Sequence, residues 1–352
     1  METLEDFDRR VAAGARSLSG WHVQAVDLTG RSEALRRASV AGALFLGCRF
    51  GPGDEESVRA RGAVVFPTVP GVPVDVYRPA LYTSRDLYDT EDYAATLDAR
   101  AYAWSQQPRE LDTALAQALH DHAIDDALTA WVRGRRLVGV MGGHTVQRGE
   151  PAYAEAARLG RALGRHRVVA TGGGPGAMEA ANLGAYLAHE PEEALAQALR
   201  ILSATPLFRP DVGAWVSTAF DVLARHPEGS ASLGIPTWHY GHEPPNPFAT
   251  AIAKYFRNAT REAILLEVCE AGIVFLPGAA GTTQEIFQDA CENYYADESS
   301  VAPMVLVGAD YWTRMVPAWP MLSALARGRP METQIHLVDS VAEAATVVLA
   351  GG

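Results

Sequence analysis

The sequence predicts an α/β protein whose larger part is a doubly wound parallel sheet, preceded by a smaller N-terminal α/β domain. From about residue 135 onward, short apolar segments alternate with segments of helical spacing, which is typical of parallel sheets. Three of the apolar segments end in glycine-rich turns, at 142–143, 172–174 and 278–281. Because ligands of such sheets bind beyond the carboxyl ends of the strands, we expect these three glycine-rich ends to converge on one site.

Residues 1–134 are expected to form the smaller domain together with a connecting helix. The apolar segments "WHVQAVDLTG", "AGALFLGC" and "RGAVVFP" are separated by charged or Pro/Gly-rich stretches, as short strands in a small α/β domain are. Residues 110–133 have helical spacing and end at a glycine, which predicts the connecting helix. The domain contains few chemically distinctive residues, so the sequence assigns it no role.

Residues 135–352 are expected to form the main domain. Its predicted strands are "RLVGVMGG", "RVVAT", "ASLGIPTW", "GIVFLPG", "APMVLVG" and "IHLVD". We expect a long helix around residues 250–270 and another from about Thr283. A mostly helical insertion at about 191–227 precedes the third strand and is placed to cover a site at the strand ends.

Composition narrows the classes of partner and compartment. The net charge of −12 disfavours nucleic acid and anionic membranes as partners. The first residues are acidic, and no apolar run reaches the roughly 20 residues that span a bilayer, so we expect a cytoplasmic protein. Three cysteines far apart in the sequence favour neither a disulfide framework nor a zinc site, and we expect no metal or other cofactor.

Two cofactor chemistries are disfavoured by particular residues. Lys254 is the only lysine, so a GxxxxGK phosphate loop is absent and a Schiff-base enzyme would depend on this residue. Gly172, Gly174 and Ala177 fit GxGxxA, but the acidic residues about 20 positions later lie in the helical pattern "AHEPEEALAQALR". A dinucleotide-binding site would need that acidic residue at the end of the next strand, which argues against a dehydrogenase.

Two motifs carry a family resemblance. "GGGPGAMEAANLGA" (172–185) together with "PGAAGTTQE" (277–285) resembles the LOG family, once labelled lysine decarboxylase, whose pattern is a GGG turn followed by PGGxGTxxE. "HEPPNP" (242–247) and "GPGAMEA" further resemble the branch of pyrimidine/purine nucleotide 5′-monophosphate nucleosidases. The resemblance covers about residues 135–352. Departures are Ala279-Ala280 after Gly278, and "MGGHT", where the family commonly has a serine.

The resemblance implies a Rossmann-like fold and a hydrolase activity. Such enzymes are nucleoside 5′-monophosphate phosphoribohydrolases, which cleave the N-glycosidic bond of a substrate such as AMP to give the free base and ribose 5-phosphate. The resemblance also implies a homodimer or a larger homo-oligomer. Within the same fold, the alternative is a non-catalytic nucleotide-binding or carrier protein.

The "PGAAGTTQE" motif suggests how a phosphate and a carboxylate can share one site. Glycosidic cleavage passes through an oxocarbenium-like ribose, which requires negative charge near C1′ and a base for water. Gly278, Gly281, Thr282 and Thr283 can hold the 5′-phosphate through backbone N–H and hydroxyl groups. By resemblance Glu285 is the catalytic glutamate; the alternative is a glutamate that caps its helix in a capping box with Thr282.

The family also carries an arginine on the helix before this strand, usually at one fixed interval ahead of the motif proline. Arg261 stands one position further from Pro277 than that interval, and Arg257 lies one helical turn earlier. A guanidinium suits the ribose hydroxyls or phosphate because its donors form a fixed fork. We favour Arg261 as the second catalytic residue, with Arg257 as the alternative.

Further substrate-binding candidates follow the other strand ends. Glu179 begins the helix after the second glycine turn and could face the sugar or base, although a glutamate that only complements the helix dipole is the alternative. His144 could contact phosphate or be an ordinary loop histidine. The expected substrate-binding residues at these strand ends are Gly142, Gly143, Gly173, Gly174, Met178, Glu179, Glu243 and Asn246.

Overall fold

The computed structural model describes residues 3–108, 110–239 and 243–350, which fold into two compact units. The first unit contains the described residues of 1–81 and 106–129, and the second those of 82–105 and 130–352. Over the described residues, no helix combines the length and the apolar character needed to cross a bilayer.

The second unit is built on a seven-stranded sheet in which every neighbouring pair is parallel. Its central strands are buried along their whole length, which explains why they appear in the sequence as uninterrupted apolar runs. The α/β fold with a parallel sheet is therefore confirmed. The strands are β6 (Leu137–Met141), β7 (Val168–Thr171), β8 (Ser232–Gly234), β9 (Ala251–Ile252), β10 (Ile273–Phe275), β11 (Met304–Val307) and β12 (Ile335–Val338).

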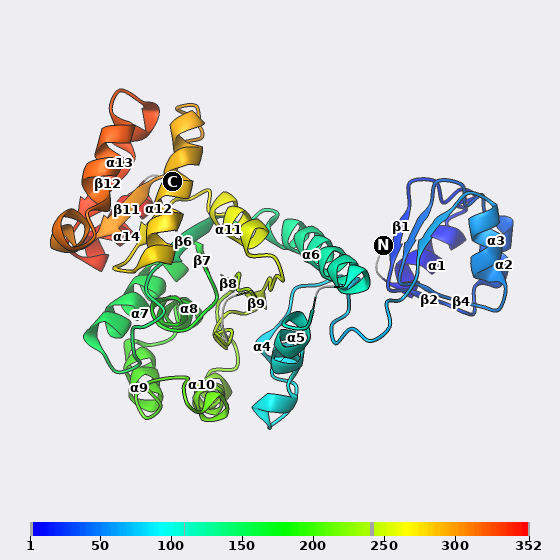
Figure 1. Ribbon diagram of the computed structural model, residues 1–352, viewed down its shortest axis with the longest axis horizontal. Helices are drawn as coiled ribbons and strands as arrows, with labels where there is room; N and C mark the ends of the chain where they lie inside the picture. The colour runs from blue at the N-terminus through cyan, green and yellow to red at the C-terminus, as the bar shows by residue number, and fades with distance from the viewer. Residues whose placement is uncertain (1–2, 109, 240–242, 351–352) are drawn as a thin grey trace. The chain divides into compact units, whose positions relative to one another are not determined.

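The strand order is β12-β11-β10-β6-β7-β8-β9, so the chain builds outward from β6 first in one direction and then in the other. Helices cover both faces (Figure 1). On one face α7 (Pro151–Gly164), α8 (Ala177–Tyr186) and α14 (Val341–Ala350) pack together. On the other face lie α11 (Asn258–Glu267), α12 (Ala280–Tyr295) and α13 (Ala318–Ala326). The sheet is therefore doubly wound.

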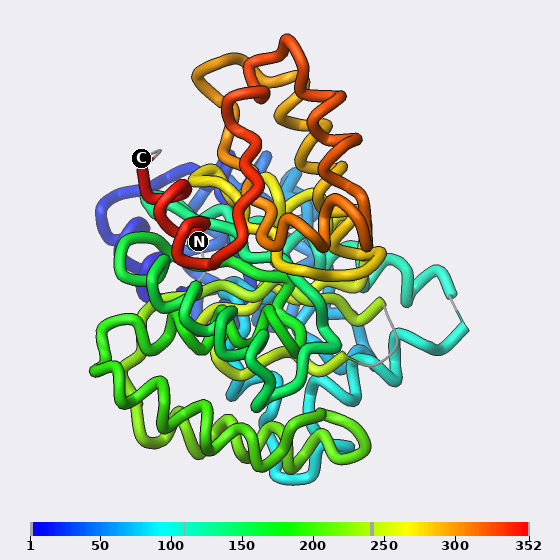
Figure 2. The backbone as a smooth tube through the Cα atoms, turned by 90° about the vertical axis from the view of Figure 1, so that its left-hand side faces the viewer, coloured from blue at the N-terminus to red at the C-terminus, as the bar shows by residue number. Residues whose placement is uncertain are grey.

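The stretch at 191–227 is helical, as expected. It contains α9 (Glu192–Leu202) and α10 (Val212–Arg225). In Figure 2 these helices, in green, lie at the end of the second unit opposite the orange and red segments around α13.

The long helix expected around residues 250–270 does not form over its first third. The backbone N–H groups of Ala253 and Tyr255 instead donate to the carbonyls of Gly234 (2.9 Å) and Pro236 (3.0 Å), which extends the pairing of β9 with β8. Helix α11 begins only at Asn258. Lys254, expected in the helix, therefore follows the edge strand and is buried.

The segment 82–105 belongs to the second unit, whereas the sequence assigned it to the N-terminal domain. It contains α4 (Ser84–Leu87), the 3-10 helix η1 (Tyr93–Ala95) and α5 (Leu97–Ser105). Tyr82 and Ile252 exchange two backbone hydrogen bonds of 2.9 and 2.7 Å. Asp98 forms a buried ion pair with Lys254 and accepts a hydrogen bond from Trp238 Nε1 (2.8 Å). Because these contacts are made with residues far away in the sequence, the sequence of the segment itself does not indicate which unit it joins.

The first unit is a small α/β structure with an internal repeat that the sequence reading missed. The repeated unit is a strand, a corner, a second strand and a helix, and it occurs twice in succession. As a result, β1 pairs with β3 and β2 pairs with β4. Ala25 and Gly47 occupy the equivalent corners, with φ of 54° and 58°. The elements are α1 (Leu4–Ala12), β1 (His22–Gln24), β2 (Asp27–Leu28), α2 (Ser32–Arg37), β3 (Leu44–Leu46), β4 (Arg49–Phe50), α3 (Asp54–Ala60) and β5 (Val64–Phe66). Helix α6 (Leu111–Val132) occupies the range expected for the connecting helix.

Replacing Asp98 by Asn should destabilise the second unit. Burial lowers the pKa of Lys254, and the Asp98 carboxylate opposes this shift, so the substitution leaves a buried ammonium without its counter-charge. Breaking a buried pair typically costs about 3–5 kcal/mol. Chemical denaturation should show a loss of this size for Asp98→Asn. The exposed Glu91→Gln in the same segment is the control, and an equal effect of both variants would contradict the assignment.

Candidate active site

The three glycine-rich strand ends lie at one cavity of about 610 Å³ in the second unit. It is found where the strand order reverses between β6 and β10, the usual position of a ligand in a doubly wound sheet. Met141 and Phe275 pair in register, so β6 and β10 end at the same level. Gly142 and Gly143 after β6, Gly172 and Gly174 after β7, and Gly278 after β10 line the cavity.

The turn into α12 brings backbone close to the cavity. A Cβ at Gly278 would lie 2.2 Å from Thr282 Oγ1, so only glycine fits there, whereas a Cβ at Gly281 would meet open space. Gly278, Gly281 and Thr282 line the cavity at the positive N-terminal end of the helix. Thr283 was predicted beside them, but it is not among the lining residues and its hydroxyl donates to the Ala279 carbonyl (3.0 Å).

Glu285 and Arg261 both line the cavity, from α12 and α11 respectively. Helix α12 begins at Ala280, so Glu285 lies beyond its first turn, and a capping box with Thr282 does not form. Arg257, the alternative arginine, is exposed at the N-terminus of α11 and is not among the lining residues. The structure therefore brings Glu285 together with Arg261.

Glu262 lines the same cavity, and the sequence reading missed it. Arg261 Nη2 lies 3.0 Å from Glu262 Oε1 and donates to Asn258 Oδ1 (3.0 Å). The signal was present, because Glu262 stands at the interval ahead of Pro277 at which the resembled family carries its arginine. Glu262 occupies that interval and Arg261 lies one position before it. Both residues line the cavity.

Two acidic groups on α12 have strongly raised pKa values. Burial raises the pKa of Glu285 to about 8; the neighbouring charge of Glu262 adds to this shift and Arg261 opposes it. Burial and the charge of Glu292 likewise raise the pKa of Asp289, one turn further along, to about 8. Asp289 is not among the lining residues. Glu285 thus lines the cavity with a pKa raised to about 8, and shifts of this kind are common among functional acids and bases.

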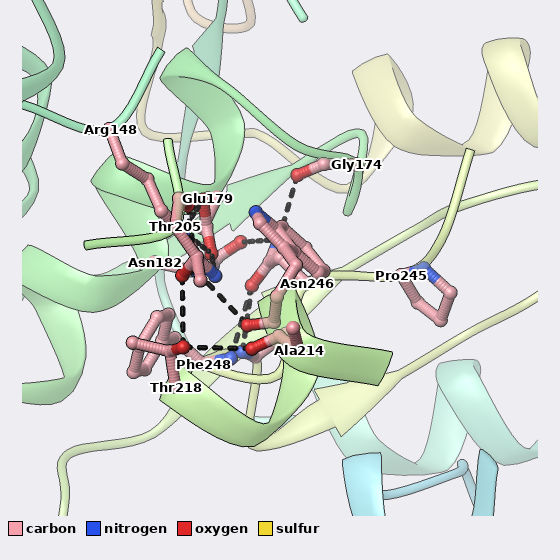
Figure 3. Close-up of polar contacts among 12 residues, drawn as sticks. Arg148, Gly174, Glu179, Asn182, Thr205, Ala214, Thr218, Pro245, Asn246 and Phe248 are labelled. Atoms are coloured by element: carbon pink, nitrogen blue, oxygen red, sulfur yellow. Dashed lines mark hydrogen bonds and ion pairs between the residues drawn. The ribbon is translucent and has the colours of Figure 1, made fainter. Parts of the chain in front are cut away.

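Glu179 does not reach the cavity, although it was predicted to bind substrate. It forms a fully buried ion pair with Arg148, shown in Figure 3. Arg148 also donates to Thr205 Oγ1 (3.1 Å) and to the Trp215 carbonyl (3.0 Å). Thr205 and Trp215 belong to the helical insertion. The ion pair of Arg148 with Glu179 therefore connects the insertion to the start of α8. The sequence analysis did not predict a role for Arg148, because no motif near it indicates that its partner is Glu179.

Asn246, another predicted substrate contact, is fully buried and is not among the lining residues; Figure 3 shows its hydrogen bonds. Its amide Nδ2 donates to the Gly174 carbonyl (3.2 Å) and to Asn182 Oδ1 (3.0 Å), while its Oδ1 accepts from the backbone of Phe248 and Ala249. Gly173 also lies outside the lining, with φ of 71°. Asn246 and Asn182 thus hold the second glycine turn in place instead of facing the cavity.

The remaining wall combines predicted and unpredicted residues. Met178 and Glu243, both predicted to bind substrate, line the cavity, and His144 Nδ1 lies 3.8 Å from Glu243 Oε1. Tyr311 was not predicted; its hydroxyl donates to the Gly278 carbonyl (2.8 Å) and closes one side. His242 of the "HEPPNP" motif lies outside the described residues. The helical insertion at 191–227 contributes no lining residue, so the expected cover over the site is not observed.

The described part of the chain contains no group of three or more His, Cys, Asp or Glu side chains able to hold a metal ion. Lys254, the only candidate for a Schiff base, is buried against Asp98 and is not among the lining residues. Among the described residues, the cavity wall contains the Arg261 guanidinium, the His144 imidazole, hydroxyl groups such as that of Thr282, and the carboxyl groups of Glu243, Glu262 and Glu285.

Asp289→Asn should make the protein more stable at alkaline pH. Asp289 stays protonated up to about pH 8 in the folded protein, whereas an unfolded aspartate loses its proton at about pH 4. The free energy of unfolding therefore falls as the pH rises from about 4 to 8. Asn mimics the protonated acid, and the gain at pH 9 should be on the order of 3 kcal/mol, shrinking towards pH 4. Chemical denaturation at several pH values measures this. A pH-independent effect, or the same effect from the exposed Asp297→Asn, would contradict it.

No family model and no curated protein matches the chain. Among solved structures, it is similar to the molybdenum cofactor binding protein from Rippkaea orientalis, with 15% identity over 61% of this chain and 96% of that one and a TM-score of 0.40. It is also similar to the molybdenum cofactor carrier protein from Chlamydomonas reinhardtii, with 17% identity over 61% and 97% of the two chains and a TM-score of 0.37.

Proposed function

We propose that the protein hydrolyses the N-glycosidic bond of nucleoside 5′-monophosphates to give the free base and ribose 5-phosphate. The observation that carries the proposal is the carboxyl group of Glu285, which has a pKa of about 8 and lines the same cavity as a helix N-terminus suited to phosphate. The sequence motifs that resemble the LOG family point to the same reaction.

Two groups of lining residues on α12 suit the two ends of such a substrate. Gly278, Gly281 and Thr282 lie at the positive end of α12, where backbone N–H groups and a hydroxyl can bind a 5′-phosphate. The protein as a whole carries a charge of −12, so an anionic ligand depends on such local donors. Glu285 lies further along the same helix, where it can reach the ribose of a nucleotide held at the helix end.

The reaction assigns a role to each group. As the bond between C1′ and the base nitrogen breaks, its electron pair leaves with the base and positive charge develops on the ribose. The ionised Glu285 stabilises this charge and accepts a proton from the water that adds to C1′. Arg261 binds the ribose or phosphate and orients the substrate for this step. The departing base takes up a proton from solvent, and Glu285 returns the proton that it accepted to solvent, so that water has added a hydroxyl to C1′ and a proton to the base.

A non-catalytic nucleotide-binding or carrier protein of the same fold is the alternative. Such a protein needs the phosphate donors, but it gains nothing from a buried acid in the same cavity, because the charge of that acid opposes an anionic ligand. Burying the Glu285 carboxyl is costly, as its raised pKa indicates. The presence of that group therefore favours the enzyme.

Glu285→Gln should still bind AMP but lose about 10²–10⁴-fold in kcat, because the amide cannot take a proton from water. Chromatography of free adenine and ribose 5-phosphate released from AMP, GMP, CMP and UMP measures the loss and ranks the bases. Glu292→Gln, exposed on the same helix, is the matched control. Full turnover by Glu285→Gln would remove Glu285 from the mechanism, whereas AMP binding without release by the unaltered protein would support the carrier.

The rate should also depend on pH through Glu285. If the carboxylate is the active form, kcat/KM for AMP rises between pH 6.5 and about 8 and levels off above, because deprotonation of the free enzyme follows the pKa of about 8. Initial rates from pH 6.5 to 9.5 test this. A rate that falls through pH 8 would make Glu285 a proton donor to the base instead.

A further inference from the structure

Tyr311 holds a peptide group of the turn between β10 and α12. Its hydroxyl donates to the Gly278 carbonyl (2.8 Å), and both residues line the cavity. A hydroxyl has a single proton, so this hydrogen bond leaves Tyr311 no donor for an anionic ligand. Tyr311 therefore acts on the contents of the cavity through the backbone that it holds, and not as a direct ligand of a phosphate.

This hydrogen bond determines where the next N–H group points. The peptide group that joins Gly278 to Ala279 is trans, so its carbonyl and its N–H point in opposite directions. Tyr311 follows β11, and β10 lies between β11 and β6 in the sheet. With the Gly278 carbonyl bound to Tyr311, the Ala279 N–H is directed towards the β6 side. On that side the Gly143 N–H meets the Pro277 carbonyl (3.2 Å) and the cavity lies.

Ala279 and Ala280 thus offer N–H groups at the start of α12. Within the described residues neither N–H has an acceptor, and α12 has no side-chain N-cap. The Ala279 carbonyl accepts from the N–H and the hydroxyl of Thr283 (both 3.0 Å), so it is held away from a ligand. Neighbouring N–H groups whose carbonyls are bound elsewhere form a concave site for an anion.

The glycine at 278 makes this restraint necessary. A Cβ there would lie 2.2 Å from Thr282 Oγ1, so the turn requires glycine, whose backbone is the least restricted. Without a hydrogen bond to its carbonyl, the peptide group is free to tilt and to turn an oxygen towards an anion. Tyr311 is itself fixed, because its ring packs edge-on against the buried Trp312, with the ring centroids 4.9 Å apart.

We propose that Tyr311 is a positioning residue for the phosphate of the substrate: its hydroxyl binds the Gly278 carbonyl, and the Ala279 N–H is thereby presented to the phosphate. This inference rests on the proposed function for the placement of the phosphate. It assigns the hydroxyl of Tyr311 an effect on the phosphate alone. Binding of the ribose and the base should not depend on that hydroxyl.

Tyr311→Phe removes the hydroxyl and keeps the ring. Calorimetry should show that the variant binds ribose 5-phosphate about 3- to 10-fold more weakly, as expected for the loss of one hydrogen bond that orders the site. Adenosine, which lacks the phosphate, should bind equally to the variant and the unaltered protein. With AMP, KM should rise by a similar factor while kcat stays within about twofold, because substrate and transition state carry the same phosphate.

Tyr295→Phe, exposed at the end of α12, is the matched control and should change neither affinity. Ala279→Pro removes the N–H itself, since proline has none. If Tyr311 acts through this N–H, Tyr311→Phe should cause no further loss of affinity for ribose 5-phosphate in the Ala279→Pro protein.

Three results would overturn the inference. One is an equal loss of affinity for adenosine and ribose 5-phosphate in Tyr311→Phe, which indicates a general disturbance of the cavity. Another is a lower kcat with unchanged KM, which places the hydroxyl at the reacting atoms. The third is an independent, additive loss from Tyr311→Phe and Ala279→Pro.

Binding and release separate this inference from the proposed function. If Tyr311→Phe weakens ribose 5-phosphate but the unaltered protein releases no adenine from AMP, the hydrolase is refuted and the positioning role is kept. If adenine is released and Tyr311→Phe leaves the affinity for ribose 5-phosphate unchanged, the hydrolase is kept and the positioning role is refuted. Failure of the unaltered protein to bind ribose 5-phosphate or AMP refutes both.

Discussion

The reversal of strand order between β6 and β10 is the constraint on which the site depends. Helices leave β6 and β10 towards opposite faces of the sheet, so the backbone beyond these two strands is not covered by either crossover. The glycines after the strands let the two turns approach, and Gly143 N–H donates to the Pro277 carbonyl (3.2 Å). The cavity, the helix N-terminus of α12 and the side chains of α11 meet there as a consequence.

Two buried ion pairs of the second unit differ from the charged groups that line the cavity. Arg148 with Glu179 and Lys254 with Asp98 are closed pairs away from the cavity, and each joins segments far apart in the sequence. Their partners satisfy them, which suits a structural role. Arg261, Glu262 and Glu285 instead line the cavity, and burial raises the pKa of Glu285. These groups lie where the strand order reverses.

Several site residues could be predicted from the sequence because their signals are local. Gly142, Gly174 and Gly278 follow apolar strands directly, and Glu285 follows the last of these turns at a fixed interval. Glu179 and Asn246 stand in equally distinctive motifs but serve the packing behind the wall, since a motif does not reveal which way a side chain points. Tyr311 reaches the cavity from a segment that no recognised motif marks, and Glu262 was missed although it stands at the interval ahead of Pro277 at which the resembled family carries its arginine.

The order and type of the elements of the second unit were largely determined by the sequence, because buried parallel strands and amphipathic helices have different apolar periods along the chain. Which distant segments contact one another was determined by the tertiary packing. The backbone of residues 253–255 joined a strand edge instead of a helix, Asp98 bound Lys254 across 156 positions, and the repeat in the first unit appeared only once its strands were stacked. Such contacts depend on burial and geometry between segments, which no local pattern of residues encodes.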